Sequence, residues 1–268
     1  IYVDGTCGLG GHSKFILSNL SSDGFLISID LDQSAIKICK ENLNAQNSKL
    51  HIEKNSYSNL PIILDHLGVK KVDGILLDLG LSSMQLDSID RGFSFSKDSY
   101  LDMRFDQSSA TSAADLINNS TESELADIIY HFGEERRSRS IAKKLIESIP
   151  ISSVQDLVNA VKRVTPPHRR NRTMARVFQA FRIAVNKELE KLSEFLSKYS
   201  DYLSKSGKII IISFHSLEDR MVKRNFKQYS EKGILKILTK KPQVASNKEC
   251  ESNSRSRSAK LRCAEKIL

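Results

Sequence analysis

Residues 4–13 combine an acidic side chain with closely spaced glycines, a combination that can hold a nucleotide-like ligand. An apolar pair leads into Asp4, four glycines fall within the next seven positions, and Lys14 to Leu20 follow a helical pattern. Glycine permits positive φ values and close backbone approach to a ligand, and a helix start offers unpaired N–H groups. The sequence therefore predicts a strand, a tight turn and a helix that together cradle a ligand.

The glycine spacing separates one class of ligand from another. A dinucleotide fingerprint needs a third glycine where Ser13 stands, and the lysine and hydroxyl of a phosphate-binding P-loop are absent. Asp4-x-x-x-Gly8-x-Gly10 is the spacing typical of S-adenosylmethionine (SAM) methyltransferases, although such glycines can also form an ordinary turn. Asp30 favours the ligand interpretation, because it ends an apolar run 22 residues after Gly8, close to the offset of about 20 at which a carboxylate binds ribose hydroxyls.

Two later apolar runs end in polar side chains that can assist the transfer of a group. Asp78 and Ser82 follow the first run, and Ser213 and His215 follow the second. The carboxyl ends of parallel strands meet at one edge of a sheet, where ligands bind. We therefore expect these four residues to surround the reacting atoms, with Asp78 also a candidate to hold the cofactor. For His215, a hydrogen-bonded structural role is the alternative.

The predicted elements that position these residues form an α/β sheet interrupted by a helical insertion. Strands alternate with helices in residues 1–87 and 177–268, which we expect to form the SAM-binding domain, whereas residues 88–176 show only amphipathic helices after an irregular stretch. Apolar spacing from Phe178 to Leu203 predicts one long helix against the sheet. Residues 234–238 and 259–264 predict a closing antiparallel pair.

The polar faces of the inserted helices are basic, and a further basic loop lies near the end of the chain. The arginines that we expect to contact RNA are Arg136, Arg137, Arg169, Arg170, Arg172, Arg176, Arg255 and Arg257. Such clusters neutralise phosphates, and Phe93, Phe95 and Phe105 are candidates to stack on unpaired bases. The alternative is a set of solvated helix faces over core aromatics.

Composition limits the partners and the cellular compartment that we expect for the protein. A net charge of +9 suits a polyanionic partner, and the 268 residues contain no apolar run of about 18 that could span a membrane. The four cysteines form no Cys-x-x-Cys pair, which argues against a zinc site and favours a reducing cytoplasm. Because Ile1 already lies in a predicted strand, we expect an N-terminal segment to be missing. A monomer and a homodimer both remain open.

Motifs in order along nearly the whole chain carry a family resemblance. They are Asp4-Gly5-Thr6, Gly10-Gly11-His12-Ser13, and the segments 78–83, 91–95, 101–104, 133–136, 178–186, 213–220 and 255–262. Together they resemble the RsmH/MraW family of bacterial small-subunit rRNA cytosine-N4 methyltransferases. Two departures stand out: Met84 occupies a position where proline is common, and Arg172–Arg176 replaces the usual His-Pro-Ala-Thr-Arg, of which only Arg176 matches. The second departure removes the histidine to which a substrate role would be assigned.

This resemblance implies a class I SAM-dependent methyltransferase fold, Rossmann-like, with a mostly parallel seven-stranded sheet. It implies SAM as the cofactor, no metal, and as acceptor a cytidine amine in the decoding centre of 16S rRNA, within the small ribosomal subunit. By matching positions, it implies cofactor contacts from Gly10, Gly11, His12, Asp30, Tyr57, Asp78 and Gln85. Two alternatives stay open: a methyltransferase for a small molecule, and an RNA-binding assembly factor with a vestigial SAM pocket. An NAD oxidoreductase is disfavoured by the missing third glycine.

Overall fold

The computed structural model describes residues 1–44 and 49–268 and divides the chain into two compact units. Unit 1 comprises Ile1–Gly80 and Leu189–Leu268, and unit 2 comprises Leu81–Glu188. These limits differ from the expected 88 and 176, because one continuous helix runs through residue 176 and belongs entirely to unit 2. Among the described helices, none has both the length and the apolar character needed to cross a bilayer.

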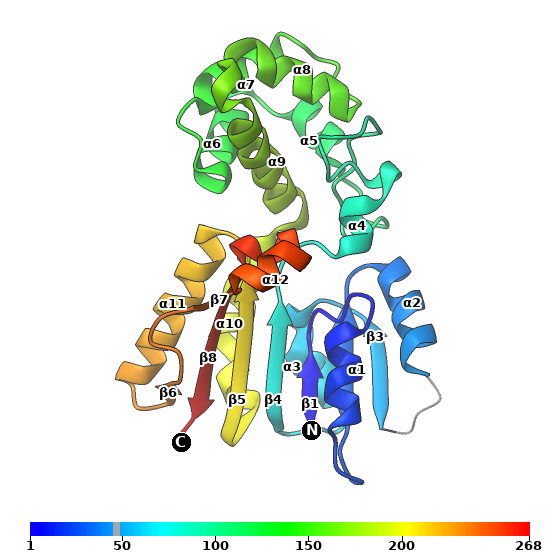
Figure 1. Cartoon of the computed structure of the whole chain (residues 1–268), viewed down its shortest axis with the longest axis vertical. Coiled ribbons are helices and arrows are strands. Elements are labelled where there is room, and N and C mark those ends of the chain that lie inside the picture. The colour runs from blue at the N-terminus through cyan, green and yellow to red at the C-terminus, as the bar shows by residue number, and fades with distance from the viewer. Residues whose placement is uncertain (45–48) are drawn as a thin grey trace. The chain divides into compact units, whose positions relative to one another are not determined.

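Unit 1 is built on a single sheet (Figure 1). Its strands are β1 (Tyr2–Asp4), β2 (Leu26–Asp30), β3 (Leu50–Lys54), β4 (Val72–Asp78), β5 (Leu203–Ser213), β6 (Leu235–Ile237), β7 (Gln243–Val244) and β8 (Lys260–Lys266). The order is β3-β2-β1-β4-β5-β8-β6, with β7 paired to β8 off this path. The first five strands are parallel to one another and β8 is antiparallel to its neighbours. Among the described residues the sheet thus has eight strands, one more than the seven expected, and seven of them lie on this path.

Helices cover both faces of this sheet. They are α1 (Gly11–Ser18), α2 (Gln33–Leu43), α3 (Leu60–His66), α10 (Glu188–Tyr202) and α11 (Ser216–Glu231). Unit 1 also contains α12 (Asn247–Ser252) and the short 3-10 turns η1 (Tyr57–Asn59) and η4 (Ser254–Ser258). One apolar core joins the central strands to α3, α10 and α11, and a second packs α2 against β2 and β3. Burial on both faces explains why these strands are almost continuously apolar. The predicted mostly parallel α/β fold and its antiparallel closing pair are confirmed.

Unit 2 is helical. Its elements are α4 (Ser83–Asp87), η2 (Ile89–Arg91), α5 (Ala113–Asn119), α6 (Glu122–Gly133), α7 (Ser138–Ile146), α8 (Val154–Val164), η3 (Pro167–Arg169) and α9 (Arg170–Asn186). Ser112, Thr121 and Ser153 start three of these helices with capping boxes, which a Ser/Thr-x-x-acid pattern specifies locally. Gly133 lets α6 approach α9, because a Cβ there would lie 2.7 Å from the carbonyl oxygen of Arg176.

The predicted long helix over Phe178–Leu203 is wrong. Lys187 adopts a left-handed conformation with φ of 52° and ends α9, after which α10 begins at Glu188. The Asn186 side chain fixes the break, since its amide donates to the Met103 carbonyl oxygen at 2.7 Å and its oxygen accepts from the Phe105 N–H at 2.6 Å. The two halves also bury their apolar faces in different cores, one in each unit.

Candidate functional site

The glycine loop between β1 and α1 has the backbone geometry that its sequence predicts. Gly8 and Gly10 have φ values of 50° and 89°, and α1 starts at Gly11. A Cβ on Gly10 would lie 3.2 Å from Leu43 and 3.3 Å from the Cys39 Sγ, whereas a Cβ on Gly11 would meet no atom within 4 Å. The loop therefore packs tightly on one side and is open at the first turn of α1, where backbone N–H groups can meet a ligand.

Asp4 is a structural residue beneath this loop. Its carboxylate is fully buried, accepts from the Ser13 Oγ at 2.6 Å and from the Thr6 N–H at 3.3 Å, and burial raises its pKa above the ordinary value. The Ser13 hydroxyl also lies 2.9 Å from the Ser28 Oγ on β2. This buried network ties β1, β2 and α1 together and keeps the loop in place.

Asp30, at the end of β2, braces the loop from the other side. One of its oxygens accepts from the Gly8 N–H at 2.9 Å and the other accepts from the Asp32 N–H at 2.9 Å. Burial raises the pKa of Asp30 to about 6. Each carboxylate oxygen has two lone pairs, so both can still accept from a hydroxyl group of a ligand.

Asp78 lies at the carboxyl end of β4 and is attached to the glycine loop. Its backbone N–H donates to the Thr6 Oγ1 at 2.6 Å, and its Oδ2 lies 3.4 Å from the His12 Nε2. The hydrogen bond to Asp78 raises the pKa of His12, whose side chain is half exposed. The Asp78 Oδ1 is buried and has no hydrogen-bond partner among the described residues. Because a buried acceptor without a partner is costly, this atom indicates a missing donor.

Tyr57 stands in η1, directly after the loop that follows β3. Its ring meets Phe195 edge to face with centroids 5.6 Å apart, and it packs against the apolar core of unit 1. A Cβ on Gly5 would lie 3.1 Å from the Tyr57 Cβ, so the first glycine makes room for this residue. Tyr57 is partly buried, as expected of a residue at the rim of the site.

The end of β5 differs from the end of β4. Ser213 is buried, and its hydroxyl donates to the Lys260 carbonyl oxygen at 3.4 Å. His215 caps α11: its Nδ1 accepts from the Glu218 N–H at 3.4 Å, and its Nε2 lies 3.2 Å from the Glu218 Oε1. The Nδ1 contact gives His215 a structural role as a helix cap, while its Nε2 is buried and forms no hydrogen bond with any described residue. Its role as a proton acceptor stays a prediction.

Ser82 and Gln85 belong to unit 2, whereas the other candidate site residues around the glycine loop belong to unit 1. They form a capping box at the start of α4: the Ser82 Oγ accepts from the Gln85 N–H at 3.2 Å, and the Gln85 Oε1 accepts from the Ser82 N–H at 3.0 Å. The Ser-x-x-Gln spacing was a visible signal for this cap. From the sequence we expected both residues to contact only ligand or substrate.

The predicted RNA-contacting arginines fall into two groups. Arg137, Arg170 and Arg176 hold unit 2 together, through the Val164 carbonyl oxygen at 2.9 Å, the Thr165 carbonyl oxygen at 3.3 Å and the Glu135 carboxylate at 3.4 Å respectively. Those with exposed side chains are Arg136, Arg169 and Arg172 in unit 2 and Arg257 in unit 1, whereas Arg255 is only partly exposed. Exposed Arg139, Lys162 and Arg163 extend the surface in unit 2.

The aromatics of the irregular stretch are mostly core residues. Phe93 is 5% exposed and lies 5.7 Å from Phe105, ring centroid to centroid, inside the apolar core of unit 2. Phe95 is 40% exposed and packs on Phe178 at 5.5 Å. The core alternative is therefore right for Phe93 and Phe105, and only Phe95 offers an open face for a base.

Sequence reasoning missed Thr6. Its hydroxyl accepts the Asp78 N–H and so connects the loop after β1 to the end of β4. The signal was a hydroxyl residue two positions beyond the strand-ending Asp4, where it can reach a neighbouring parallel strand.

Comparison with known proteins assigns the chain to a family. The model of the MraW methylase family matches residues 1–267. The chain belongs to the MraW methylase family. Its resemblance to this family, carried by the motifs of the sequence, is thus confirmed, and the reaction class of an MraW methylase is methyl transfer.

Individual relatives align with this chain over its whole length. A protein of Caldicellulosiruptor saccharolyticus named ribosomal RNA small subunit methyltransferase H is 46% identical over 286 residues, covering 100% of this chain and 93% of its own length. A protein of Kosmotoga olearia with the same name is 46% identical over 273 residues, covering 100% and 91%. Among solved structures, a putative rRNA methylase from Clostridium thermocellum aligns over 99% of this chain and 88% of its own, at 16% identity and a TM-score of 0.48, which adds nothing to the family assignment.

Proposed function

We propose that this MraW methylase transfers the methyl group of SAM to the exocyclic N4 of a cytidine in the decoding centre of 16S rRNA. The observation that carries the cofactor assignment is the buried Oδ1 of Asp78, which accepts no hydrogen bond from any described residue and lies at the carboxyl end of β4, beside the loop that follows β1. The rRNA assignment is supported by relatives named ribosomal RNA small subunit methyltransferase H. Such a substrate places the enzyme in the cytoplasm.

The residues of unit 1 fit the parts of SAM. The Asp78 Oδ1 would accept from the methionine ammonium group, and the free lone pairs of Asp30 would accept from the ribose hydroxyls. Gly11 would offer open backbone at the start of α1, Gly10 would shape the turn through its positive φ, and Tyr57 would contact the adenine. We assign His12 and Gln85 to cofactor contacts by their positions in the family motifs.

The chemistry requires a well-placed acceptor nitrogen. When bound, SAM supplies a methyl group on a positively charged sulfur, which becomes a neutral thioether as the nitrogen–carbon bond forms. The cytosine amine is a weak nucleophile because its lone pair is conjugated with the ring, so the protein must align it while its proton leaves. In our proposal the Ser213 hydroxyl helps to orient the amine of a base that has left its stack, the Asp78 carboxylate stays with the cofactor, and the proton passes to solvent. His215 acts by fixing the start of α11.

The exposed basic surface of unit 2 is our candidate for rRNA contact. Arg136, Arg169 and Arg172 are exposed and available for phosphates, and Arg257 adds a basic side chain in unit 1. Arg137, Arg170 and Arg176 would support this surface from below, because their guanidinium groups are already bonded within unit 2.

Two competing functions make different predictions. An assembly factor with a vestigial pocket would gain nothing from an unpaired Asp78 oxygen, and calorimetry without SAM binding would favour it. A small-molecule methyltransferase would keep full activity after charge reversal at Arg169 and Arg172.

The decisive experiment incubates the enzyme with methyl-labelled SAM and small ribosomal subunits from a strain that lacks this methylation. Nucleoside analysis of the recovered rRNA should show labelled N4-methylcytidine. Asp78→Asn serves as the matched control, because it keeps the size of the side chain and removes its charge. Label in another nucleoside, or none in RNA while SAM binds normally, would overturn the assignment.

A further inference from the structure

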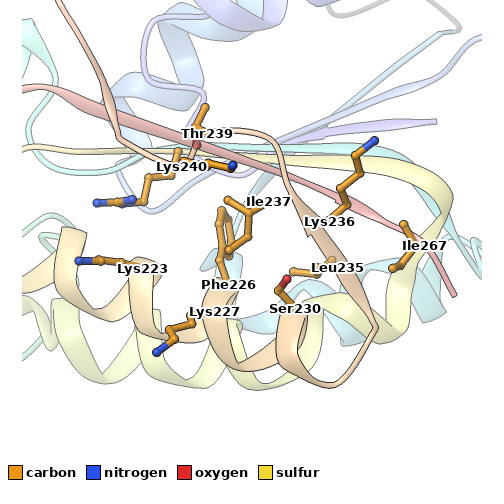
Figure 2. A pocket seen from close by; sticks show the side chains of 11 residues that line it. Lys223, Phe226, Lys227, Ser230, Leu235, Lys236, Ile237, Thr239, Lys240 and Ile267 are labelled. Carbon is orange, nitrogen blue, oxygen red and sulfur yellow. The ribbon is translucent and has the colours of Figure 1, made fainter.

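A hollow lies in unit 1, at the edge of the sheet where α11 faces β6 and the end of β8 (Figure 2). Its volume is about 630 Å³, within the range of about 300–1,000 Å³ that small-molecule sites occupy. The floor is apolar: Phe226 and Leu235 are buried, and Ile237 and Ile267 complete it. None of the candidate site residues described above lines this pocket.

The rim of the pocket is cationic. Lys223 and Lys227 stand one turn apart on α11, and Lys236 and Lys240 come from β6 and the segment after it. Figure 2 shows Phe226 and Ile237 between α11 and the sheet, with the amines of Lys227 and Lys236 at the outer rim, pointing away from the hollow on its two sides. No carboxylate lines the pocket. The walls therefore present positive charge on two sides of an apolar floor.

Ion pairs neutralise only part of this charge. Arg262, which also lines the pocket, is held by Asp219 at 2.7 Å, and Lys227 lies 3.5 Å from Glu231 at the surface. Among the described residues, Lys223, Lys236 and Lys240 have no ion-pair partner. Like charges around one hollow repel each other, so the folded chain maintains an arrangement that an anion would stabilise.

Protection of a sheet edge accounts for only one of these lysines. β6 is the last strand in the sheet order, and a lysine on an edge strand discourages pairing with another chain. This explains Lys236 on β6. It does not explain Lys223 on a helix, or Lys240 beyond the strand, both of which face the same hollow.

We propose that this pocket binds a segment of the single-stranded RNA substrate outside the target nucleotide, with a base on the apolar floor and the flanking phosphates on the lysines. The inference rests on the proposed function. Lysines line the pocket from α11 on one side and from β6 and the segment after it on the other. An RNA strand carries a phosphate at every nucleotide and can neutralise lysines on both sides, whereas a single small anion would neutralise those on one side only. A nucleotide also supplies the flat, weakly polar surface that the floor accommodates.

The test compares two triple variants with the same loss of charge. Lys223→Gln/Lys236→Gln/Lys240→Gln removes the unpaired rim, and Lys37→Gln/Lys70→Gln/Lys205→Gln removes three exposed lysines elsewhere in unit 1. Affinity for a fluorescein-labelled single-stranded RNA of about 16 nucleotides is measured by anisotropy over a series of salt concentrations. The rim variant should bind at least about tenfold more weakly, and its slope of log affinity against log salt should shrink by about 2. A rim variant that binds as the matched triple does would overturn the proposal.

A third variant asks whether the hollow itself matters. Ser230 lines the pocket on α11, so Ser230→Phe fills it without altering charge and should weaken RNA binding about tenfold. Wild-type affinity in this variant, combined with a weak rim variant, would mean that the lysines form an open patch, and the pocket assignment would be wrong. The rim triple replaces only exposed side chains and keeps the proposal testable if Ser230→Phe unfolds.

Methyl transfer measured in parallel separates the two proposals. If the unmodified enzyme methylates rRNA and the rim variant binds RNA as tightly as the unmodified enzyme does, the pocket proposal is rejected and the proposed function stands. If the rim variant loses RNA affinity as expected but the unmodified enzyme methylates no rRNA, the proposed function is rejected and the pocket proposal stands.

Discussion

The carboxyl ends of β4 and β5 look alike in sequence and differ in what their polar side chains do. Asp78, at the end of β4, has a buried oxygen that no described residue satisfies. His215, just beyond β5, caps α11 through its Nδ1, and its buried Nε2 lies 3.2 Å from the Glu218 Oε1. Position at a strand end therefore identifies a candidate, and the local hydrogen bonds decide whether its side chain is available to a ligand.

The largest expected effect comes from replacing Asp78 at the end of β4. Asp78→Ala removes the proposed acceptor for the cofactor ammonium and should weaken SAM binding about a hundredfold, since bonds to a charged group contribute about 1.5–3 kcal/mol. Isothermal titration gives the affinity, and circular dichroism checks that the variant is folded. Normal SAM binding together with wild-type turnover would break the contrast between the two strand ends.

The same contrast within unit 2 gives the next largest effect. Gln in place of exposed Arg136, Arg169 and Arg172 should lower RNA affinity about thirtyfold and reduce the salt slope by about 2, with unchanged thermal stability. The matched set, Arg137, Arg170 and Arg176, is bonded internally, so its replacement should lower the unfolding temperature first. Anisotropy and thermal melts on both sets make the comparison. Equal losses of affinity at unchanged stability would contradict the division.

A third strand end, that of β2, is tested by pH. Burial raises the pKa of Asp30 to about 6, so acidification through that value protonates the carboxylate that would bind the ribose. SAM affinity should fall about tenfold between pH 7 and pH 5. Because the folded pKa is raised, the same protonation favours the folded state, so stability contributed by Asp30 should rise, not fall, over this range. Asp30→Asn should lose this pH dependence of binding, and its persistence would assign it to another group.

The smallest effect concerns the residue that caps α11 after β5. His215→Ala removes the cap of α11 and should destabilise the protein by about 1 kcal/mol, while the single-turnover rate at saturating RNA stays within about twofold of wild type. Denaturant unfolding and rapid quench supply the two values. A rate loss above tenfold in a stably folded variant would restore His215 as a catalytic residue.

The fold was predictable where the local sequence pattern agrees with the packing of the folded protein. The parallel strands, the glycine loop and the antiparallel close each follow from apolar runs and turn residues. The break at Lys187 was not, since residues 183–188 contain neither glycine nor proline and the apolar spacing continues through them. The break depends on Asn186 reaching the backbone near residue 104, a contact between residues 81 to 83 positions apart in the chain.

The site was predictable by residue type but not by hydrogen-bond state. Asp78 and His215 were both candidates by residue type, and only the coordinates show that the Nδ1 of His215 caps α11 through the Glu218 N–H, whereas Asp78 caps none of the described helices. The arginines show the same limit, because sequence spacing cannot tell Arg137, which bonds to a carbonyl oxygen, from exposed Arg136 next to it.

All of unit 2 lies within the single connection between the neighbouring parallel strands β4 and β5. The entropy lost on closing such a connection grows only with the logarithm of its length, at about 0.6 kcal/mol per doubling, so the sheet tolerates the insertion at little thermodynamic cost. The insertion should instead slow folding, because β4 and β5 are far apart in the sequence and their pairing is a non-local contact. The central pairing of the catalytic sheet should accordingly be among its last steps of assembly.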